Sequence, residues 1–305
     1  MSFTVLAATF ANNILPIIFL SGAGFALGKL LQIDPRSLGR VVFYVFSPVL
    51  LFDLLVRNQL KLTDAAVVIV FALCFILTIG LLTFLIGYFL KLERSALVAI
   101  LITTMFANTG NYGLPLVSFA FGEQALSYAG IYFATTTLLF YTLGVFLASL
   151  GHMTFQEALA GMFKIPTMYA VFLAILINTF NVAIPVPVAR AVELAAGGTI
   201  PLMLILLGVQ LTKVELSGNQ RALQLSVGLR LVIAPLAALL FAALFGLQGS
   251  TRQAGVTQAS MPSMVSATVL AAEYNLDARL VTAVVFISTL LSPFTLTPLL
   301  VFLGN

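Results

Sequence analysis

Amide, hydroxyl and proline residues interrupt an apolar stretch at residues 105–116 that is otherwise long enough to cross a membrane. Asn108, Thr109 and Asn111 compete for backbone hydrogen bonds, and Pro115 removes a backbone donor, so a helix cannot continue undisturbed. Within a bilayer, freed backbone groups are tolerated only where protein buries them or a wet cavity meets them. The pattern predicts a broken helix at a ligand site, with Asn108, Thr109, Asn111 and Tyr112 as candidate ligand contacts.

A second interruption, at residues 259–266, brings a proline and three hydroxyls into another membrane-length segment about 153 positions downstream. The same offset relates Pro48 to Pro201. Corresponding broken helices in two repeats point to the binding site of a secondary transporter. The candidate contacts from the second interruption are Ser260, Pro262, Ser263 and Ser266.

The chemistry that these residues offer is binding. A half-helix N-terminus carries unpaired N–H groups and partial positive charge, and the surrounding amides and hydroxyls both donate and accept, so a small carboxylate is the expected ligand. The only histidine, His152, falls in the connection after the fifth expected span, so we expect no His-based metal site or Ser-His-Asp arrangement. The single cysteine, Cys74, excludes an intramolecular disulfide or a cysteine metal cluster. We expect no enzymatic activity, cofactor or metal centre.

The composition indicates a membrane protein with many spans. The chain is 61% hydrophobic and 8% charged, against about 25% charged in soluble domains, and no basic run suggests nucleic acid as a partner. We expect an all-α polytopic fold of ten transmembrane helices in two inverted five-helix repeats, residues 1–153 and 154–305. The expected spans are 8–31, 36–56, 64–90, 95–120, 123–149, 165–183, 187–211, 219–246, 251–272 and 277–303.

Basic residues in alternating connections indicate the orientation. Nine fall in the connections after the odd-numbered spans, and four on the opposite face. The richer side is expected to be cytoplasmic, which places both termini outside. Arg230 alone lies within a span. Three roles are open for it: reaching the inner interface, holding a carboxylate substrate, or neutralising a helix C-terminus.

Proline and glycine residues suggest how the other spans are shaped. Pro48 and Pro201 predict kinks that make room beside the crossing helices and bring both prolines near the ligand, or that only shape packing. Gly24 and Gly28, at Gly-xxx-Gly spacing, predict close contact with another helix.

The broken segments resemble the auxin efflux carrier family. The matching stretches are Asn108-Thr-Gly-Asn111-Tyr-Gly113-Leu-Pro115-Leu, the run from Met261 to Tyr274, and Phe286-Ile-Ser-Thr-Leu-Leu-Ser. The resemblance implies a bile acid:sodium symporter-like fold in which broken helices 4 and 9 cross at the membrane midplane. It implies a scaffold from about 8–56 and 165–211, where a homodimer would form, and a moving core from about 64–149 and 219–303.

The same resemblance implies a carrier of small organic anions in a bacterial inner membrane, working by elevator-type alternating access. Dicarboxylates such as malonate or malate are the first expectation, and an auxin-like monocarboxylate is the second. A membrane sensor or channel that binds the same ligand is the alternative. Uniport, proton coupling and sodium coupling stay open, with Gln258 and Glu273 as weak sodium-site candidates.

Overall fold

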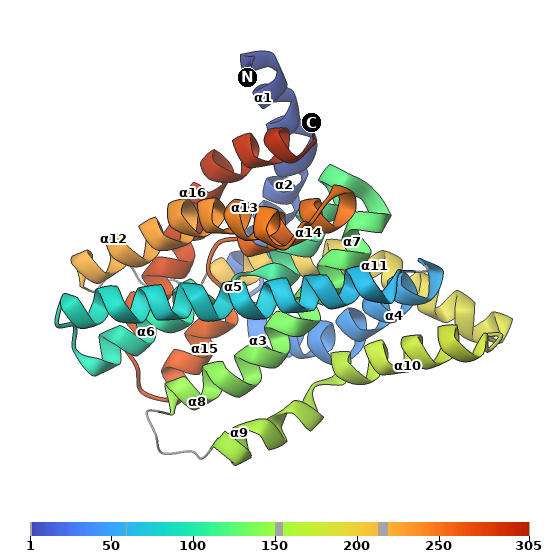
Figure 1. The fold of residues 1–305 in the computed structure, drawn as a ribbon, viewed down its shortest axis with the longest axis horizontal. Helices are drawn as coiled ribbons and strands as arrows, with labels where there is room; N and C mark the ends of the chain where they lie inside the picture. The colour runs from blue at the N-terminus through green and yellow to red at the C-terminus, as the bar shows by residue number, and fades with distance from the viewer. Residues whose placement is uncertain (1, 59, 150–154, 213–218, 305) are drawn as a thin grey trace.

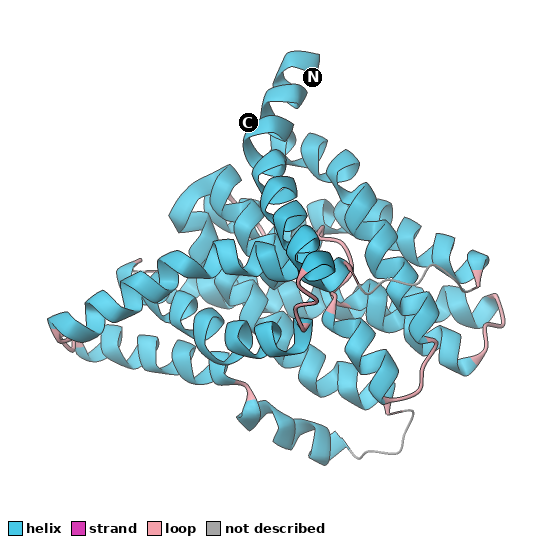
Figure 2. Cartoon of the chain, turned by 180° about the vertical axis from the view of Figure 1, so that it is seen from behind, coloured by secondary structure: helices cyan, strands magenta, loops and turns pink. Residues whose placement is uncertain are grey.

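The computed structural model describes residues 2–58, 60–149, 155–212 and 219–304, and His152 and Lys213 lie outside these ranges. The described chain is almost entirely helical (Figure 2), and its one β-type contact is an isolated bridge between Ala107 and Ser263. Seven helices in this part of the chain are long and apolar enough to cross a membrane. The prediction of an all-α membrane protein is therefore confirmed at this level.

The first half of the chain follows the expected order of spans (Figure 1). Its helices are α1 (Phe3–Thr9), α2 (Leu15–Leu30), α3 (Pro35–Val41), α4 (Ser47–Arg57), α5 (Leu62–Phe89), α6 (Arg94–Met105), α7 (Leu114–Leu139) and α8 (Val145–Ala148). Gly122 in α7 has φ 76° and ψ −168°, so the helix changes direction there. This residue lies between the expected spans 95–120 and 123–149.

The second half begins with a short helix, α9 (Phe155–Ala160), in a region where the sequence predicts only a connection. It continues through α10 (Pro166–Phe180), α11 (Val186–Leu211), α12 (Gln220–Gly228), α13 (Ala234–Leu244), α14 (Gly249–Ala259), α15 (Ser266–Glu273) and α16 (Ala278–Gly304). Helices α1 and α16 lie together at one end of the molecule (Figure 1), and both chain ends are therefore on the same side.

Proline explains most of the irregular turns inside the long helices. Four π-helical turns, at Phe10–Ile14, Val42–Phe46, Thr109–Gly113 and Leu229–Ile233, each end just before a Leu-Pro, Ser-Pro or Ala-Pro pair. Proline has no N–H to donate to the preceding turn, and a wider turn accommodates its ring. A π-helical turn precedes Pro48, where a kink is predicted, whereas Pro201 lies inside the continuous helix α11.

Outside the spans, the connection before α3 is stabilised by an N-cap. The Asp34 carboxylate accepts hydrogen bonds from the Ser37 hydroxyl and from the backbone N–H groups of Arg36 and Ser37. These bonds, with that from the Ser37 hydroxyl first, lower the pKa of Asp34. The start of α3 is therefore set by the sequence locally.

Helices α2 and α11 approach each other through glycine. A Cβ added to Gly24 would lie 2.1 Å from the Ile205 carbonyl oxygen, and one added to Gly208 would lie 1.8 Å from the Ser21 carbonyl oxygen. A Cβ on Gly28 would meet the Thr212 side chain at 2.9 Å. The close packing predicted from Gly24 and Gly28 is therefore present, and Gly208 is its counterpart on α11.

We predict that Gly208→Ala lowers the melting temperature in detergent, because the new methyl would meet backbone atoms of α2 that cannot rotate away. Overpacking of this kind typically costs about 1–3 kcal/mol of unfolding free energy. Gly22→Ala is the matched control, since nothing lies within 4 Å of a Cβ there. Alanine should be neutral or slightly stabilising at that position. Equal melting temperatures for the two variants would contradict the close approach.

Candidate functional site

The two predicted interruptions are both present, and they lie against each other. The backbone N–H of Asn108 donates to the Pro262 carbonyl at 2.8 Å, and the N–H of Met264 donates to the Phe106 carbonyl at 3.0 Å. These reciprocal bonds flank the bridge between Ala107 and Ser263. Each broken helix therefore satisfies part of the other's backbone, as buried N–H and C=O groups require.

Ser263 contributes further bonds to this pairing. Its hydroxyl donates to the Thr103 carbonyl at 2.7 Å, near the end of α6, and its N–H donates to the Ser288 hydroxyl of α16 at 3.1 Å. Ser263 is fully buried. Its side chain is thus engaged in holding the two breaks together.

Arg230, in the π-helical turn between α12 and α13, binds the C-terminal ends of two half-helices. Its Nε donates to the Met261 carbonyl at 2.6 Å, one of its terminal nitrogens donates to the Thr104 carbonyl at 2.9 Å, and the other donates to the Ala259 carbonyl. Thr104 lies in the last turn of α6, and Ala259 is the last residue of α14. One guanidinium therefore joins both broken helices.

The location of Arg230 excludes one of its three expected roles. The side chain is completely buried, and no carboxylate of the described residues forms an ion pair with it. The expectation that it reaches the inner interface is therefore wrong, because three backbone carbonyls inside the protein bind the guanidinium. The structure places it at helix C-termini, where a positive charge is favoured.

Several buried polar atoms beside the breaks have no hydrogen-bond partner. They include the Asn108 side-chain nitrogen and the Thr109 hydroxyl from the first break, and the Thr257 hydroxyl and the Gln258 side-chain oxygen from the end of α14. Across the described residues, only Thr137 and Thr167 add further such atoms. Buried polar groups are nearly always paired, so this concentration marks a place where a polar ligand or water is expected.

Asn111 lies at a different contact, between the first break and α11. Its side-chain amide donates to the Gln210 side-chain oxygen at 3.3 Å. Asn111 is only partly buried, whereas Asn108 is 4% exposed. The two asparagines of the motif thus have different environments.

The other predicted contacts are placed as follows. The Tyr112 hydroxyl accepts from Ser292 at 3.2 Å, and the Ser260 hydroxyl donates back within α14 to the Val256 carbonyl. The Pro262 carbonyl is used by Asn108, and Ser266 is partly exposed at the first position of α15. Pro48 is buried and Pro201 is exposed.

The two weak sodium candidates do not share an environment. Gln258 is fully buried, its nitrogen donates to the Ala129 carbonyl at 3.2 Å, and a Cβ on Gly113 would lie 2.0 Å from its oxygen. A side chain at position 113 would force the Gln258 amide to move. Glu273 is exposed at the end of α15. Gln258 therefore belongs to the region of the breaks, and Glu273 lies apart from that buried region.

Three residues that are not among the predicted contacts also contribute. Gln210 meets Asn111 from α11, Ser288 accepts from the Ser263 backbone, and Ser226 shares a 2.9 Å hydrogen bond with Thr103. The signal in the sequence was that each is a polar residue in an apolar span, and Ser288 also lies in the stretch Phe286-Ile-Ser-Thr-Leu-Leu-Ser. Nothing in the sequence pattern could pair them with their partners.

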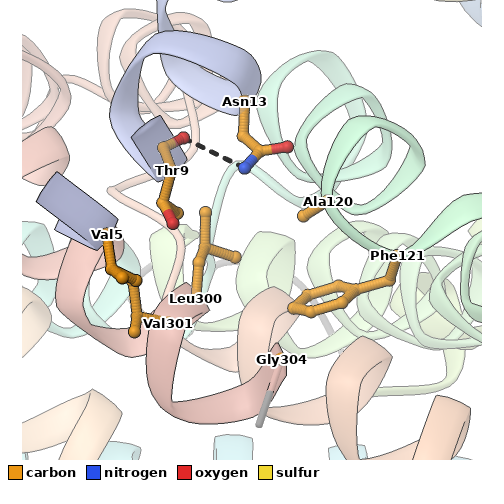
Figure 3. Close-up of a pocket in the computed structure, with 8 residues that line it drawn as sticks. All are labelled: Val5, Thr9, Asn13, Ala120, Phe121, Leu300, Val301 and Gly304. Atoms are coloured by element: carbon orange, nitrogen blue, oxygen red, sulfur yellow. Dashed lines mark hydrogen bonds between the residues drawn. The ribbon is translucent and has the colours of Figure 1, made fainter. Parts of the chain in front are cut away.

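A cavity of about 200 Å³ lies away from the paired breaks, between α1, α7 and α16 (Figure 3). Its described lining residues are uncharged: Val5, Thr9, Asn13, Ala120, Phe121, Leu300, Val301 and Gly304. The Asn13 amide donates to the Thr9 carbonyl at 3.0 Å. The cavity therefore offers a carboxylate no charged partner, and the electrostatic features that suit an anion are at the breaks.

Comparison with known proteins gives the same class. A family described as membrane transport protein matches residues 9–157 and 152–300. An uncharacterized transporter of Methanothermobacter thermautotrophicus is 29% identical over 282 residues, covering 92% of this chain and 93% of that protein. An uncharacterized transporter of Methanocaldococcus jannaschii is 27% identical over 278 residues, covering 87% and 88%. The chain therefore belongs to the membrane transport protein family, which is the auxin efflux carrier family that its broken helices resemble.

Proposed function

We propose that this protein is a secondary carrier of small organic anions, with a dicarboxylate such as malonate or malate as the leading substrate class and an auxin-like monocarboxylate as the second. The observation that carries the proposal is the pairing of the two breaks beside buried polar atoms that lack partners. The substrate would bind Asn108 and Thr109 near the N-termini of the half-helices that begin at Thr109 and Ser266.

The charge of the helix ends at the two breaks favours an anionic substrate. Arg230 compensates the C-terminal ends of α6 and α14, whereas no acidic side chain lies in the first turn of either half-helix that begins at a break. Each of those N-termini carries roughly +0.5 elementary charge. A carboxylate placed between them would accept N–H groups and meet positive potential, as anions do at helix N-termini.

We also propose the ten-span architecture with two inverted repeats and an elevator motion. The Gly122 break would divide the 40-residue helical stretch Thr109–Ala148, which makes eight spans of the seven long helices. Helix α6 would share one span with the first part of that stretch, and α10 and the α14–α15 pair would complete the ten. A moving core that contains both breaks would then slide along α2, α4, α10 and α11. The contact between Asn111 and Gln210 joins the two parts, so it would break and re-form during the motion.

We predict counterflow in proteoliposomes. Vesicles loaded with unlabelled malonate or malate should take up the labelled compound faster than empty vesicles, because an alternating-access carrier returns loaded more readily than empty.

We also predict that cross-linking stops exchange in the same assay. In the double variant Asn111→Cys with Gln210→Cys, on a Cys74→Ser background, exchange should stop once a short reducible bis-thiol reagent joins the two introduced cysteines. Reduction should restore it.

The alternative function gives other results in this assay. A sensor would bind substrate without flux, and a channel would show flux without acceleration by internal substrate. Exchange that continues at full rate after complete cross-linking would contradict sliding of the core along α11. The single cysteine variants treated with the same reagent are the controls.

We predict that Asn108→Ala weakens substrate binding by about 1.5–3 kcal/mol, roughly tenfold to a hundredfold in Kd, because a hydrogen bond to a charged carboxylate is lost. Its stability should change little, since the Asn108 side-chain nitrogen has no protein partner to lose. Isothermal titration and thermal unfolding in detergent measure the two effects separately.

Asn178→Ala is the matched control for this variant. The Asn178 amide donates to the Leu55 carbonyl at 2.8 Å, between α10 and α4. Its loss should lower stability by about 0.5–1.5 kcal/mol and leave Kd unchanged. Wild-type affinity in Asn108→Ala would place the ligand elsewhere.

For orientation, we propose a bacterial inner membrane location with both termini outside. The support is the nine basic residues against four in alternating connections, together with the placement of α1 and α16 at one end of the fold. A reporter that works only in the cytoplasm should be inactive when fused after Asn305. Activity of that fusion would reverse the sidedness of every connection.

A further inference from the structure

Three backbone carbonyls from two broken helices converge on one positive group. They belong to Thr104 at the end of α6, Ala259 at the end of α14, and Met261 in the second break, and each accepts a hydrogen bond from a different nitrogen of Arg230. In transporters with discontinuous helices, unwound carbonyls and half-helix C-termini are the groups that coordinate a monovalent coupling cation. Here a side chain of the protein binds them.

The positive charge of Arg230 matches the partial negative charges at the ends of α6 and α14. A helix C-terminus carries roughly −0.5 elementary charge, so the ends of α6 and α14 together are balanced by one guanidinium. No described carboxylate pairs with Arg230, so its counter-charge comes from the backbone. The group is completely buried, so it stays between the two ends without exchanging with the solution.

We propose that Arg230 is a tethered substitute for a coupling cation. It occupies the cation position between the two half-helix C-termini, and the substrate cycle of this chain consequently runs without Na⁺. Only the independence of the cycle from Na⁺ rests on the proposed transport function. That Arg230 fills a cation position follows from its contacts with the three carbonyls alone.

The remaining sodium candidate fits this arrangement. The Gln258 side-chain oxygen is unpartnered, and the carbonyls of Ala259 and Met261, which follow it closely in the sequence, already accept from Arg230. A metal ion beside a fixed guanidinium would also meet repulsion in a region of low dielectric constant. The free oxygen of Gln258 is therefore available to a hydrogen-bond donor.

The first test measures cation binding without transport. Arg230→Ala removes the charge and leaves a space lined by three carbonyls, so millimolar guanidinium or methylguanidinium should raise its melting temperature by several degrees in detergent, relative to choline at equal ionic strength. Wild type should show no such shift. Arg230→Met, which fills the space with an apolar chain, should be destabilised and should not respond to guanidinium. Arg57→Ala controls for arginine loss at a site where the partners are the carboxylates of Asp53 and Glu193.

The second test measures the cycle. Substrate exchange by the wild-type protein should proceed at the same rate in sodium and in choline, and Na⁺ should leave its melting temperature unchanged. Guanidinium should restore at least part of the exchange that Arg230→Ala loses. If Arg230→Ala does not fold, Arg230→Lys retains one positive charge and should fold with fewer carbonyl contacts, and guanidinium should then have no effect on it.

The outcomes test separately whether Arg230 fills a cation position and whether the transport cycle runs without Na⁺. The proposed cation position would be contradicted if guanidinium did not raise the melting temperature of folded Arg230→Ala. It would also be contradicted if guanidinium raised the melting temperature of Arg230→Met equally. If Na⁺ accelerated wild-type exchange or raised the melting temperature of the wild-type protein, Arg230 would not replace a coupling cation. Absence of any exchange in the wild-type protein together with guanidinium rescue of stability would contradict the transport proposal and leave the cation position in place.

Discussion

The central constraint on this structure is the need to satisfy the backbone groups that two buried helix breaks leave free. A break in a membrane interior frees N–H and C=O groups, each of which is costly to leave unpaired. The protein meets this need by setting the breaks against each other, so that Asn108 bonds to Pro262 and Met264 bonds to Phe106. Arg230 binds the carbonyls that remain at the ends of α6 and α14. Neither broken helix could keep this geometry without the other.

This solution treats the two kinds of helix end differently. The C-terminal ends are neutralised from within, by a guanidinium that is held in place. The N-terminal ends have no acidic partner in their first turns, and buried polar atoms of Asn108 and Thr109 lie unpaired next to them. A region with compensated negative ends and uncompensated positive ends suits an anion, so one arginine bound to helix C-termini can influence the charge preference of the site.

The remaining contacts join this region to the helices around it. Gly24 and Gly208 let α2 and α11 approach at backbone distance, which makes these two helices a closely packed pair. Across the boundary, one hydrogen bond of 3.3 Å between Asn111 and Gln210 connects α11 to the first break. Backbone-close glycine packing resists relative movement, whereas a single bond between partly buried amides breaks at little cost. Any sliding would therefore occur between α11 and the break rather than between α2 and α11.

The sequence by itself determined the membrane class, the helical content, the positions of both breaks, the close packing at Gly24 and Gly28, and the family. These follow from local properties: hydropathy, the missing N–H of proline and the small size of glycine. Only the tertiary structure decided which polar groups pair. Arg230, Ser263 and Tyr112 have partners at Thr104, Thr103 and Ser292, respectively, and these partners are far away in the sequence. Asn108 and Asn111 look equivalent in the motif, yet one is buried without a side-chain partner and the other meets Gln210. Such differences depend on how distant helices pack, and no spacing rule within one segment contains them.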